Sequence, residues 1–301
     1  MNKQLTKNFA PGHGTCSGCG IPAIVRNILD VSEDPVVVVN ATGCLEVTST
    51  LYPYTAWKVP YIHNAFENAG ATVSGIEAAY KVLEKKGKVK GKINFVVFGG
   101  DGSTYDIGLQ ALSGALERGH RFLYVAYDNQ GYMNTGGQRS GATPYGANMT
   151  TTPAAKGDIG NELDRKDIME IVAAHGVKYL AQANVFNIED MRAKAKKAFE
   201  TDGPSFLLVL QPCTNSWKFP VSDYVKVAKL AHDTNYWTLY EIENGQYKIN
   251  QYISNPKPIE EFLKTQKRFK HLLLPENKKA LEKIQRDVDF RLEKLKKKTG
   301  E

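Results

Sequence analysis

The sequence has few cysteines and lacks any long hydrophobic run, and each absence excludes a class of protein. Its 301 residues include four cysteines, and residues 1–10 contain no apolar leader. A disulfide framework of the secreted type is therefore not expected. No stretch reaches the roughly 18 apolar residues that a membrane-spanning helix needs. We predict a cytoplasmic protein that does not enter a membrane and whose cysteines serve metal or redox chemistry.

The chain also lacks a concentrated basic patch, although its formal net charge is +7. The excess of lysine is spread over short clusters and is densest at residues 294–298. We therefore expect no nucleic-acid partner. A solvated lysine-rich face accounts for most of these residues, and such a face could also steer an acidic protein partner.

Short β-branched runs alternate with stretches of helical period between residues 22 and 210, which is typical of a parallel sheet with crossover helices. The predicted strands are 36–39, 93–98, 122–127, 178–181 and 206–210, and the predicted helices are 21–29, 69–85, 104–118, 167–175 and 188–200. This pattern predicts an α/β fold with a doubly wound parallel sheet over residues 1–217. Residues 218–301 are interpreted as a C-terminal extension, with a hairpin around Asn244-Gly245 and a basic helix near 277–298.

The first chemical motif is a glycine turn after a predicted strand. The strand at 93–98 runs into Gly99-Gly100-Asp101-Gly102-Ser103 and then into a helical pattern. Glycines let the backbone approach an anion, and a helix N-terminus favours a diphosphate. Asp101 would supply a hard oxygen ligand to a magnesium ion that bridges the two phosphates.

The loop after the next predicted strand strengthens this interpretation. That strand ends at Asp128-Asn129-Gln130-Gly131, and a right-handed crossover brings this loop to the same edge of the sheet. Asn129 and the Gly131 carbonyl can then ligate the same ion. A Gly-Asp-Gly turn is by itself more often structural, but an asparagine 28 positions later resembles the signature of thiamine-diphosphate enzymes. No Gly-x-Gly-x-x-Gly opens a helix here, which disfavours a dinucleotide site.

The second motif is the cysteine set, a close pair at Cys16 and Cys19 followed by the distant Cys44 and Cys213. This spacing fits either a tetrahedral zinc site or a four-cysteine iron–sulfur cluster. Two arguments favour iron and sulfur. Cys44 and Cys213 each follow a predicted strand, at the same sheet edge as the diphosphate motif. Thiamine chemistry that releases electrons one at a time also needs a nearby acceptor, and zinc accepts none.

Together these motifs resemble the β subunit of the pyruvate:ferredoxin oxidoreductase (pyruvate synthase) family. The resemblance is carried by four segments, at residues 15–20, 41–46, 60–68 and 99–146, and it covers most of residues 11–217. It implies a 2-oxoacid:ferredoxin oxidoreductase that converts pyruvate, coenzyme A and oxidised ferredoxin to acetyl-CoA, carbon dioxide and reduced ferredoxin. The reaction is reversible, and the sequence does not decide its direction.

The resemblance assigns roles to individual residues. Cys16, Cys19, Cys44 and Cys213 match the ligands of a [4Fe–4S] cluster, with Cys44 also counted among the cofactor contacts. The magnesium ligands correspond to Asp101, Asn129 and Gly131. The diphosphate cradle corresponds to Gly100, Asp101, Gly102 and Ser103, and an active-site asparagine corresponds to Asn134. Ile21 stands where some single-chain relatives carry a glutamate that touches the cofactor, so that contact is in doubt here.

The resemblance also implies partners, because this chain matches only the diphosphate-binding half of a thiamine enzyme. An α subunit is expected to supply the pyrimidine-binding domain and its activating glutamate. Further γ and δ subunits, the latter ferredoxin-like, are expected to pass electrons on, because the chain lacks the closely spaced cysteines of a two-cluster ferredoxin. His13, His63 and Arg139 lie in or near these motifs, and for each a structural role is at least as well supported as a catalytic one.

Several alternatives remain open at this stage. The substrate could be oxalate, 2-oxoisovalerate or 2-oxoglutarate in place of pyruvate. More remote alternatives are a thiamine lyase or synthase subunit without redox chemistry, and a zinc-bearing scaffold subunit.

Overall fold

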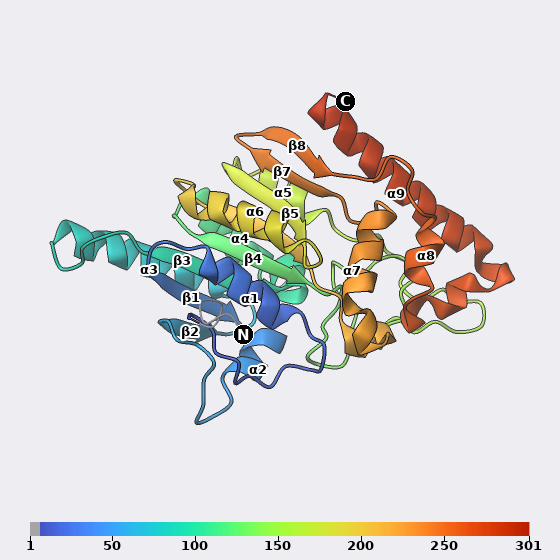
Figure 1. Cartoon of the computed structure of the whole chain (residues 1–301), viewed down its shortest axis with the longest axis horizontal. Helices are drawn as coiled ribbons and strands as arrows, with labels where there is room; N and C mark the ends of the chain where they lie inside the picture. Colours follow the sequence, from blue (N-terminus) through green and yellow to red (C-terminus); the bar gives the residue numbers. More distant parts are fainter. Residues whose placement is uncertain (1–6, 301) are drawn as a thin grey trace.

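The computed structural model describes residues 7–300, which form a single twisted sheet covered by helices (Figure 1). The sheet has eight strands in the order β2-β1-β3-β4-β6-β5-β7-β8. Its strands are β1 (Val36–Ala41), β2 (Tyr61–Asn64), β3 (Asn94–Gly100), β4 (Leu123–Asp128), β5 (Tyr179–Asn184), β6 (Ser205–Leu210), β7 (Leu239–Glu243) and β8 (Gln246–Gln251). The first six run parallel, whereas β7 pairs antiparallel with β5 and β8 pairs antiparallel with β7.

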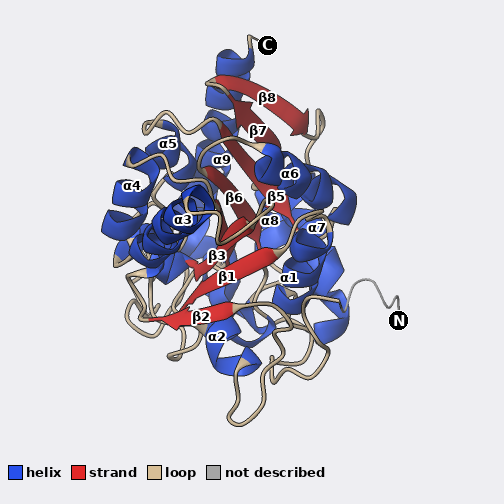
Figure 2. Cartoon of the chain, turned by 90° about the vertical axis from the view of Figure 1, so that its left-hand side faces the viewer, coloured by secondary structure: helices blue, strands red, loops and turns tan. Residues whose placement is uncertain are grey.

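Helices cover both faces of this sheet (Figure 2). The helices are α1 (Ile21–Asp30), α2 (Cys44–Ser49), α3 (Ala69–Lys85), α4 (Leu109–Glu117), α5 (Ile168–Ala173), α6 (Ile188–Glu200), α7 (Tyr224–Asp233), α8 (Ile259–Leu263) and α9 (Lys278–Thr299). Apolar side chains of α1 and α6 share one core layer, and those of α3, α4 and α5 share the other. The predicted doubly wound α/β fold is therefore confirmed.

The strand sequences explain why both faces are covered. In β1, Val38 points into the layer that contains α1 and Val39 into the layer that contains α3, and both are fully buried. Alternate residues of a strand point to opposite faces, so a continuous run of valine needs apolar cover on both sides. The run of valines in β1 is accordingly covered on both faces, between the edge strand β2 and β3.

The C-terminal hairpin forms where the Asn-Gly signal predicts it. Asn244 and Gly245 have φ values of 49° and 78°, the left-handed pair that a tight two-residue hairpin turn requires. β7 pairs with β5, so the hairpin extends the main sheet. The division of the chain into two parts at residue 217 stays a prediction. Among residues 7–300, none of the helices combines the length and the apolar character that crossing a membrane requires.

Several elements differ from the sequence prediction. The predicted helix at 104–118 is instead a π-helical turn, η2 (Gly102–Asp106), followed by α4. Gly108 separates the two, and a side chain there would meet the Ser103 carbonyl oxygen at 1.9 Å. The short elements α2, β2 and α7 were not predicted, because their patterns are too short or too mixed to carry a periodic signal.

Candidate active site

Four loops that carry the predicted functional residues meet at one edge of the sheet. Each loop follows the carboxyl end of a parallel strand: β1 leads to Cys44, β3 to Asp101, β4 to Asn129 and β6 to Cys213. Ligands of open α/β sheets bind at this edge. The sheet therefore brings together residues that lie up to 169 positions apart in the sequence, from Cys44 to Cys213.

A pocket of about 130 Å³ opens between these loops, and it combines the two motifs. Asp101, Asn129 and Gly131 line it together with Cys44, and Asn134 also contributes to its wall. The remaining lining residues are Thr42, Gly43, Phe66, Gly100, Gly102, Tyr127, Tyr132, Met133 and Thr135. A cysteine of the second motif thus faces the same cavity as the predicted magnesium ligands.

The predicted magnesium ligands are spaced as neighbours in one coordination sphere. The pocket-facing amide atom of Asn129 lies 3.0 Å from Asp101 Oδ1 and 2.8 Å from the Gly131 carbonyl oxygen. With its nitrogen at this position, the amide donates two hydrogen bonds. With the amide oxygen of Asn129 at this position, it lies beside Asp101 Oδ1 and the Gly131 carbonyl oxygen, so three oxygen atoms face one point. Adjacent ligands of an octahedral magnesium ion with bonds near 2.1 Å lie about 3 Å apart, so this arrangement fits the ion.

The glycines of the turn leave room that side chains would fill. A Cβ on Gly102 would meet the Tyr132 ring at 2.3 Å, and one on Gly131 would meet the Met149 methyl at 2.6 Å. Both positions line the pocket. Their lack of a side chain is therefore required for the walls to pack as they do.

Asp101 is a buried carboxylate that needs a cation. It is 2% exposed, and it accepts a short hydrogen bond from Ser140 Oγ. Burial and the nearby Asp128 carboxylate raise the pKa of Asp101 well above its ordinary value. No basic side chain among the described residues forms an ion pair with it. A bound divalent cation would favour its ionised form.

Asp128, by contrast, is neutralised by a network that the sequence did not reveal. Its Oδ2 lies 2.7 Å from Arg165 Nη2 and accepts a 2.7 Å hydrogen bond from the Tyr105 hydroxyl. Burial alone would lower the pKa of Arg165, but Tyr105 and Asp128 beside it raise that pKa above its ordinary value. Arg165 lies in an irregular segment without a motif, so no sequence signal could have identified it.

The four cysteines are free thiols near the same sheet edge; Cys16 is exposed and the other three are partly buried. Burial raises the pKa of Cys19 and of Cys44 to about 12, with smaller contributions from neighbouring cysteines, and burial also raises that of Cys213. Uncompensated thiolates are therefore disfavoured in this environment. A ligand that supplies positive charge, such as iron, would stabilise them.

Polar groups are directed at the sulfur atoms. Cys19 Sγ accepts a hydrogen bond from Gln211 Nε2 at 3.8 Å, and Cys16 Sγ accepts one from Asn215 Nδ2 at 3.5 Å. The Ser216 amide donates to Cys213 Sγ at 3.4 Å. Such hydrogen bonds to sulfur tune iron–sulfur centres.

The cysteines do not stand in contact as ligands of one ion. Within residues 7–300, no group of three or more His, Cys, Asp or Glu side chains is close enough to hold a single metal ion. The four thiolates of an iron–sulfur cluster surround a core of several atoms, so they stand further apart than the ligands of one ion. The donor set of free thiols and hydrogen-bond donors to sulfur is compatible with that larger group.

The other predicted residues have different surroundings. Asn134 is exposed at the pocket wall, whereas Ser103 is buried outside the lining and donates to the Gly100 carbonyl at 2.9 Å. His63 Nε2 lies 2.8 Å from Thr42 Oγ1, and His13 Nδ1 lies 2.8 Å from Thr15 Oγ1. The Arg139 Nε atom is buried without a hydrogen-bond partner among the described residues.

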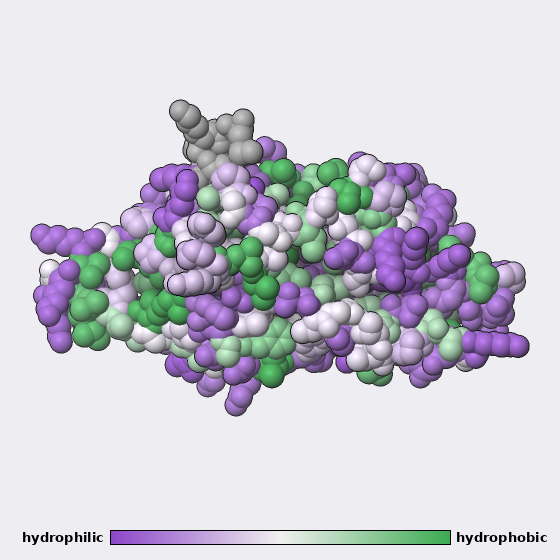
Figure 3. Space-filling model, turned by 90° about the horizontal axis from the view of Figure 1, so that it is seen from below, coloured by the Kyte–Doolittle hydropathy of each residue, from purple (hydrophilic) through white to green (hydrophobic). Residues whose placement is uncertain are grey.

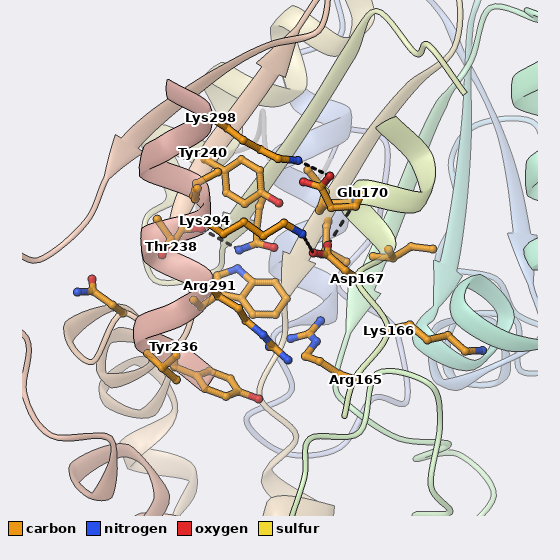
Figure 4. Close-up of a pocket in the computed structure, with 18 residues that line it drawn as sticks. Arg165, Lys166, Asp167, Glu170, Tyr236, Thr238, Tyr240, Arg291, Lys294 and Lys298 are labelled. Atoms are coloured by element: carbon orange, nitrogen blue, oxygen red, sulfur yellow. Dashed lines mark hydrogen bonds and ion pairs between the residues drawn. The ribbon is translucent and has the colours of Figure 1, made fainter. Parts of the chain in front are cut away.

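A second cavity lies away from these loops, between α5 and α9 over strands β5, β6 and β7 (Figure 4). Ion pairs span it. Lys298 pairs with Glu170, and Lys294 Nζ lies 4.0 Å from Asp167 Oδ2. Arg165 also lines this cavity, so its guanidinium lies between the cavity and Asp128. The paired charges join α9 to the N-terminal part of α5.

The fold and the pocket together define a domain that binds a diphosphate cofactor at the carboxyl edge of a parallel sheet. A comparison with known protein families supports this assignment. Residues 41–209 match the family described as thiamine pyrophosphate enzyme, C-terminal TPP binding domain.

Whole-chain relatives narrow the family further. The pyruvate synthase subunit PorB of Thermotoga maritima is 50% identical, and the match covers 97% of this chain and 94% of the relative. PorB of Methanocaldococcus jannaschii is 50% identical over 93% and 94% of the two chains. The ketoisovalerate oxidoreductase subunit VorB of Pyrococcus abyssi is 45% identical over 99% and 96%.

A solved structure shares the fold. The 2-oxoglutarate:ferredoxin oxidoreductase of Magnetococcus marinus, with 2-oxoglutarate, coenzyme A and succinyl-CoA bound, aligns with a TM-score of 0.58. Its sequence identity is 20%, and the alignment covers 76% of this chain and 81% of that chain. The chain therefore belongs to the thiamine pyrophosphate enzymes and, within them, to the family of the pyruvate synthase PorB subunits. This confirms the resemblance seen in the sequence motifs.

Proposed function

We propose that this chain is the β subunit of a 2-oxoacid:ferredoxin oxidoreductase that acts on pyruvate. Pyruvate, coenzyme A and two oxidised ferredoxins are converted to acetyl-CoA, carbon dioxide, two reduced ferredoxins and a proton, and the reaction is reversible. The observation that carries the proposal is the shared pocket, which Cys44 lines together with Asp101, Asn129 and Gly131. It supports a thiamine site that adjoins an electron acceptor.

Asp101, Asn129 and the Gly131 carbonyl would hold Mg²⁺, and the ion would hold the diphosphate. Gly100 and Gly102 leave the pocket wall free of side chains where the phosphates approach. Thiamine diphosphate, when bound, supplies the electron sink for decarboxylation. Asn134 is exposed in the same wall and would donate a hydrogen bond to the substrate.

Cys16, Cys19, Cys44 and Cys213 would ligate a [4Fe–4S] cluster. The support is the partial burial and the raised pKa values of Cys19, Cys44 and Cys213, together with the three donors directed at sulfur. Cys44 lies at the boundary between the two sites. An electron that leaves the cofactor pocket would therefore have a short path to the cluster.

The pocket is too small to enclose a cofactor alone. Ligand pockets commonly measure about 300–1,000 Å³, against about 130 Å³ here. An exposed apolar loop follows α2, on the face seen in Figure 3, where hydrophobic residues lie among polar ones. In it Leu51, Tyr52 and Tyr54 are 54%, 97% and 77% exposed.

An exposed apolar loop of this kind is typical of a subunit contact. We therefore propose that an α subunit covers this face, completes the pocket and supplies the activating glutamate. Further γ and δ subunits would carry electrons to ferredoxin.

Pyruvate is favoured as the substrate because the PorB subunits of Thermotoga maritima and Methanocaldococcus jannaschii, at 50% identity, are more similar to this chain than the VorB subunit of Pyrococcus abyssi, at 45%. No finding favours oxalate, 2-oxoisovalerate or 2-oxoglutarate for this chain.

The test is anaerobic purification of the chain with its partner subunits. Brown protein with acid-labile sulfide, and reduction of a viologen dye that requires both pyruvate and coenzyme A, are the expected results. Colourless protein that contains zinc would support a scaffold role instead. Decarboxylation without dye reduction would indicate a thiamine lyase or synthase.

A further inference from the structure

Arg268 is a buried cation without an acidic partner. It lies in η5 (Lys267–Leu273), a 3₁₀-helical segment, and is 2% exposed. Within residues 7–300, no carboxylate forms an ion pair with it, whereas Arg165, which lines the second cavity, pairs with Asp128. An isolated buried charge is strongly destabilising unless something compensates it.

The protein satisfies Arg268 only in part. Nη2 donates to Gln130 Oε1 at 2.6 Å, and Nε donates to Gln266 Oε1 at 2.9 Å. Nη1 is buried with no hydrogen-bond partner in the described part of the chain. The guanidinium carbon lies 3.9 Å from the centroid of the Trp217 ring. These neutral contacts hold the group in place but leave its charge uncompensated.

The position of Arg268 links the two halves of the proposed active site. Gln130 lies between Asn129 and Gly131 and has a φ of 66°, a conformation that is uncommon for a residue with a side chain. Trp217 belongs to η3 (Thr214–Lys218), which begins directly after Cys213. Arg268 thus contacts both the proposed magnesium loop and the loop of a proposed cluster ligand.

The charged groups around Arg268 indicate which anionic group its positive charge compensates. Asp128 already pairs with Arg165, and Asp101 receives the magnesium ion under the proposed function. Under the same proposal, the ligated cysteine site would carry the remaining negative charge near Arg268, which packs on Trp217 beside the Cys213 loop. Burial lowers the pKa of Arg268 to about 9, so it stays protonated at neutral pH.

We propose that Arg268 is a positioning residue that supplies the fixed positive charge for the cysteine-ligated cluster and so raises the reduction potential of that cluster. Reduction adds a negative charge, and a nearby cation in a medium of low dielectric constant stabilises the reduced form. This inference rests on the proposed function, because it requires an iron–sulfur cluster at the four cysteines.

The test is an anaerobic redox titration of the purified complex, followed by paramagnetic resonance of the cluster. Arg268→Gln removes the charge, and we expect the ratio of reduced to oxidised cluster at a fixed potential to fall at least tenfold, a shift of 59 mV to more negative potential. Arg268→Lys keeps the charge and should stay near the wild-type potential. Lys194→Gln is the matched control, since Lys194 is a buried cation paired with Asp190 on α6.

The outcomes separate the inference from the proposed function. An unchanged potential in Arg268→Gln, with a normal four-iron signal, would overturn the inference and leave the proposed function intact. If the Arg268→Gln variant loses its iron, it has no cluster potential to measure, and the Arg268→Lys variant then tests the inference. A wild-type cluster in the lysine variant supports the role of charge, whereas loss of iron from a natively folded lysine variant overturns it. Iron-free wild-type complex would overturn the proposed function itself.

Discussion

The indole of Trp217 donates a hydrogen bond of 2.9 Å from Nε1 to the main-chain carbonyl of Asn129. Trp217 follows the proposed cluster ligand Cys213, and Asn129 is a proposed magnesium ligand. Both residues are buried, so the bond is shielded from water. The two loops therefore share a rigid contact, and a change in one should affect the other.

Trp217→Phe tests this contact. The ring that packs beneath Arg268 is largely kept, but the Asn129 carbonyl loses its donor. A buried acceptor left without a partner destabilises a protein by about 1–3 kcal/mol. Loss of support behind a metal ligand reduces metal affinity by about 10–100-fold. We expect lower Mg²⁺ and thiamine diphosphate affinity in calorimetry, together with a lower unfolding midpoint. Wild-type affinity would show that the contact does not support the magnesium loop.

Asp101→Ala should abolish binding of thiamine diphosphate while the fold is retained. The substitution removes the anionic ligand of the proposed magnesium site. The loss should therefore exceed the roughly 100-fold that follows from a change in supporting residues alone. Calorimetry on the reconstituted complex measures it. Asp233→Asn, a carboxylate held by Lys229 and Lys257, is the control and should bind the cofactor normally.

Cys213→Ala should yield a labile or three-iron cluster. The fourth thiolate anchors one iron and sets the charge of the cluster. Iron content should fall and the paramagnetic resonance spectrum should change, with slower reduction in a single turnover. A normal four-iron signal in this variant would mean that another group is the ligand.

Glu241 should govern part of the acid stability. This strand residue is 3% exposed and accepts hydrogen bonds from Tyr179 Oη at 2.9 Å and from Lys197 Nζ at 3.0 Å. Burial alone would raise the pKa of Glu241, but the hydrogen bonds from Lys197, Tyr179 and Asn250 lower it below the usual 4.5. A lowered folded-state pKa gives stabilisation that is fully present above pH 4.5 and is lost as the pH falls through the lowered value.

The measurement is denaturant unfolding of wild type and Glu241→Gln at pH 7 and at pH 3. At pH 7 the variant should be less stable by about 2 kcal/mol, the range of hydrogen bonds to charged groups. The gap between the two proteins should narrow at pH 3. An equal gap at both pH values would show that the carboxylate charge is not what stabilises this strand.

The chain alone should not oxidise pyruvate, even with thiamine diphosphate, Mg²⁺ and an intact cluster. The aminopyrimidine ring needs a carboxylate across the cofactor, and a correctly placed group supplies a large share of the rate. Glu46 and Glu67 lie in segments, at residues 41–46 and 60–68, that resemble the diphosphate-binding half of the family, so we expect neither to fill this role. Addition of the α subunit should restore dye reduction that depends on coenzyme A. Full turnover by the chain alone would contradict a divided active site.

The sequence by itself determined the fold class and the two motifs. Valine-rich runs separated by helical periods specify a parallel sheet covered on both faces, because each such strand needs apolar cover on both sides. The Asn244-Gly245 pair specifies its hairpin, because both residues must adopt positive φ values. Asp101 and Asn129 follow neighbouring strands, so their meeting could be predicted without coordinates.

Only the tertiary structure decided which charges are compensated. Arg165 reaches Asp128 from 37 positions away, and Arg268 reaches Gln130 from 138 positions away. Neither arginine belongs to a motif, and local sequence carries no information on which buried groups lie within a few ångströms of each other. The folded chain pairs Asp128 with Arg165 and leaves Arg268 beside the loop of Cys213, because η5 packs there against Trp217.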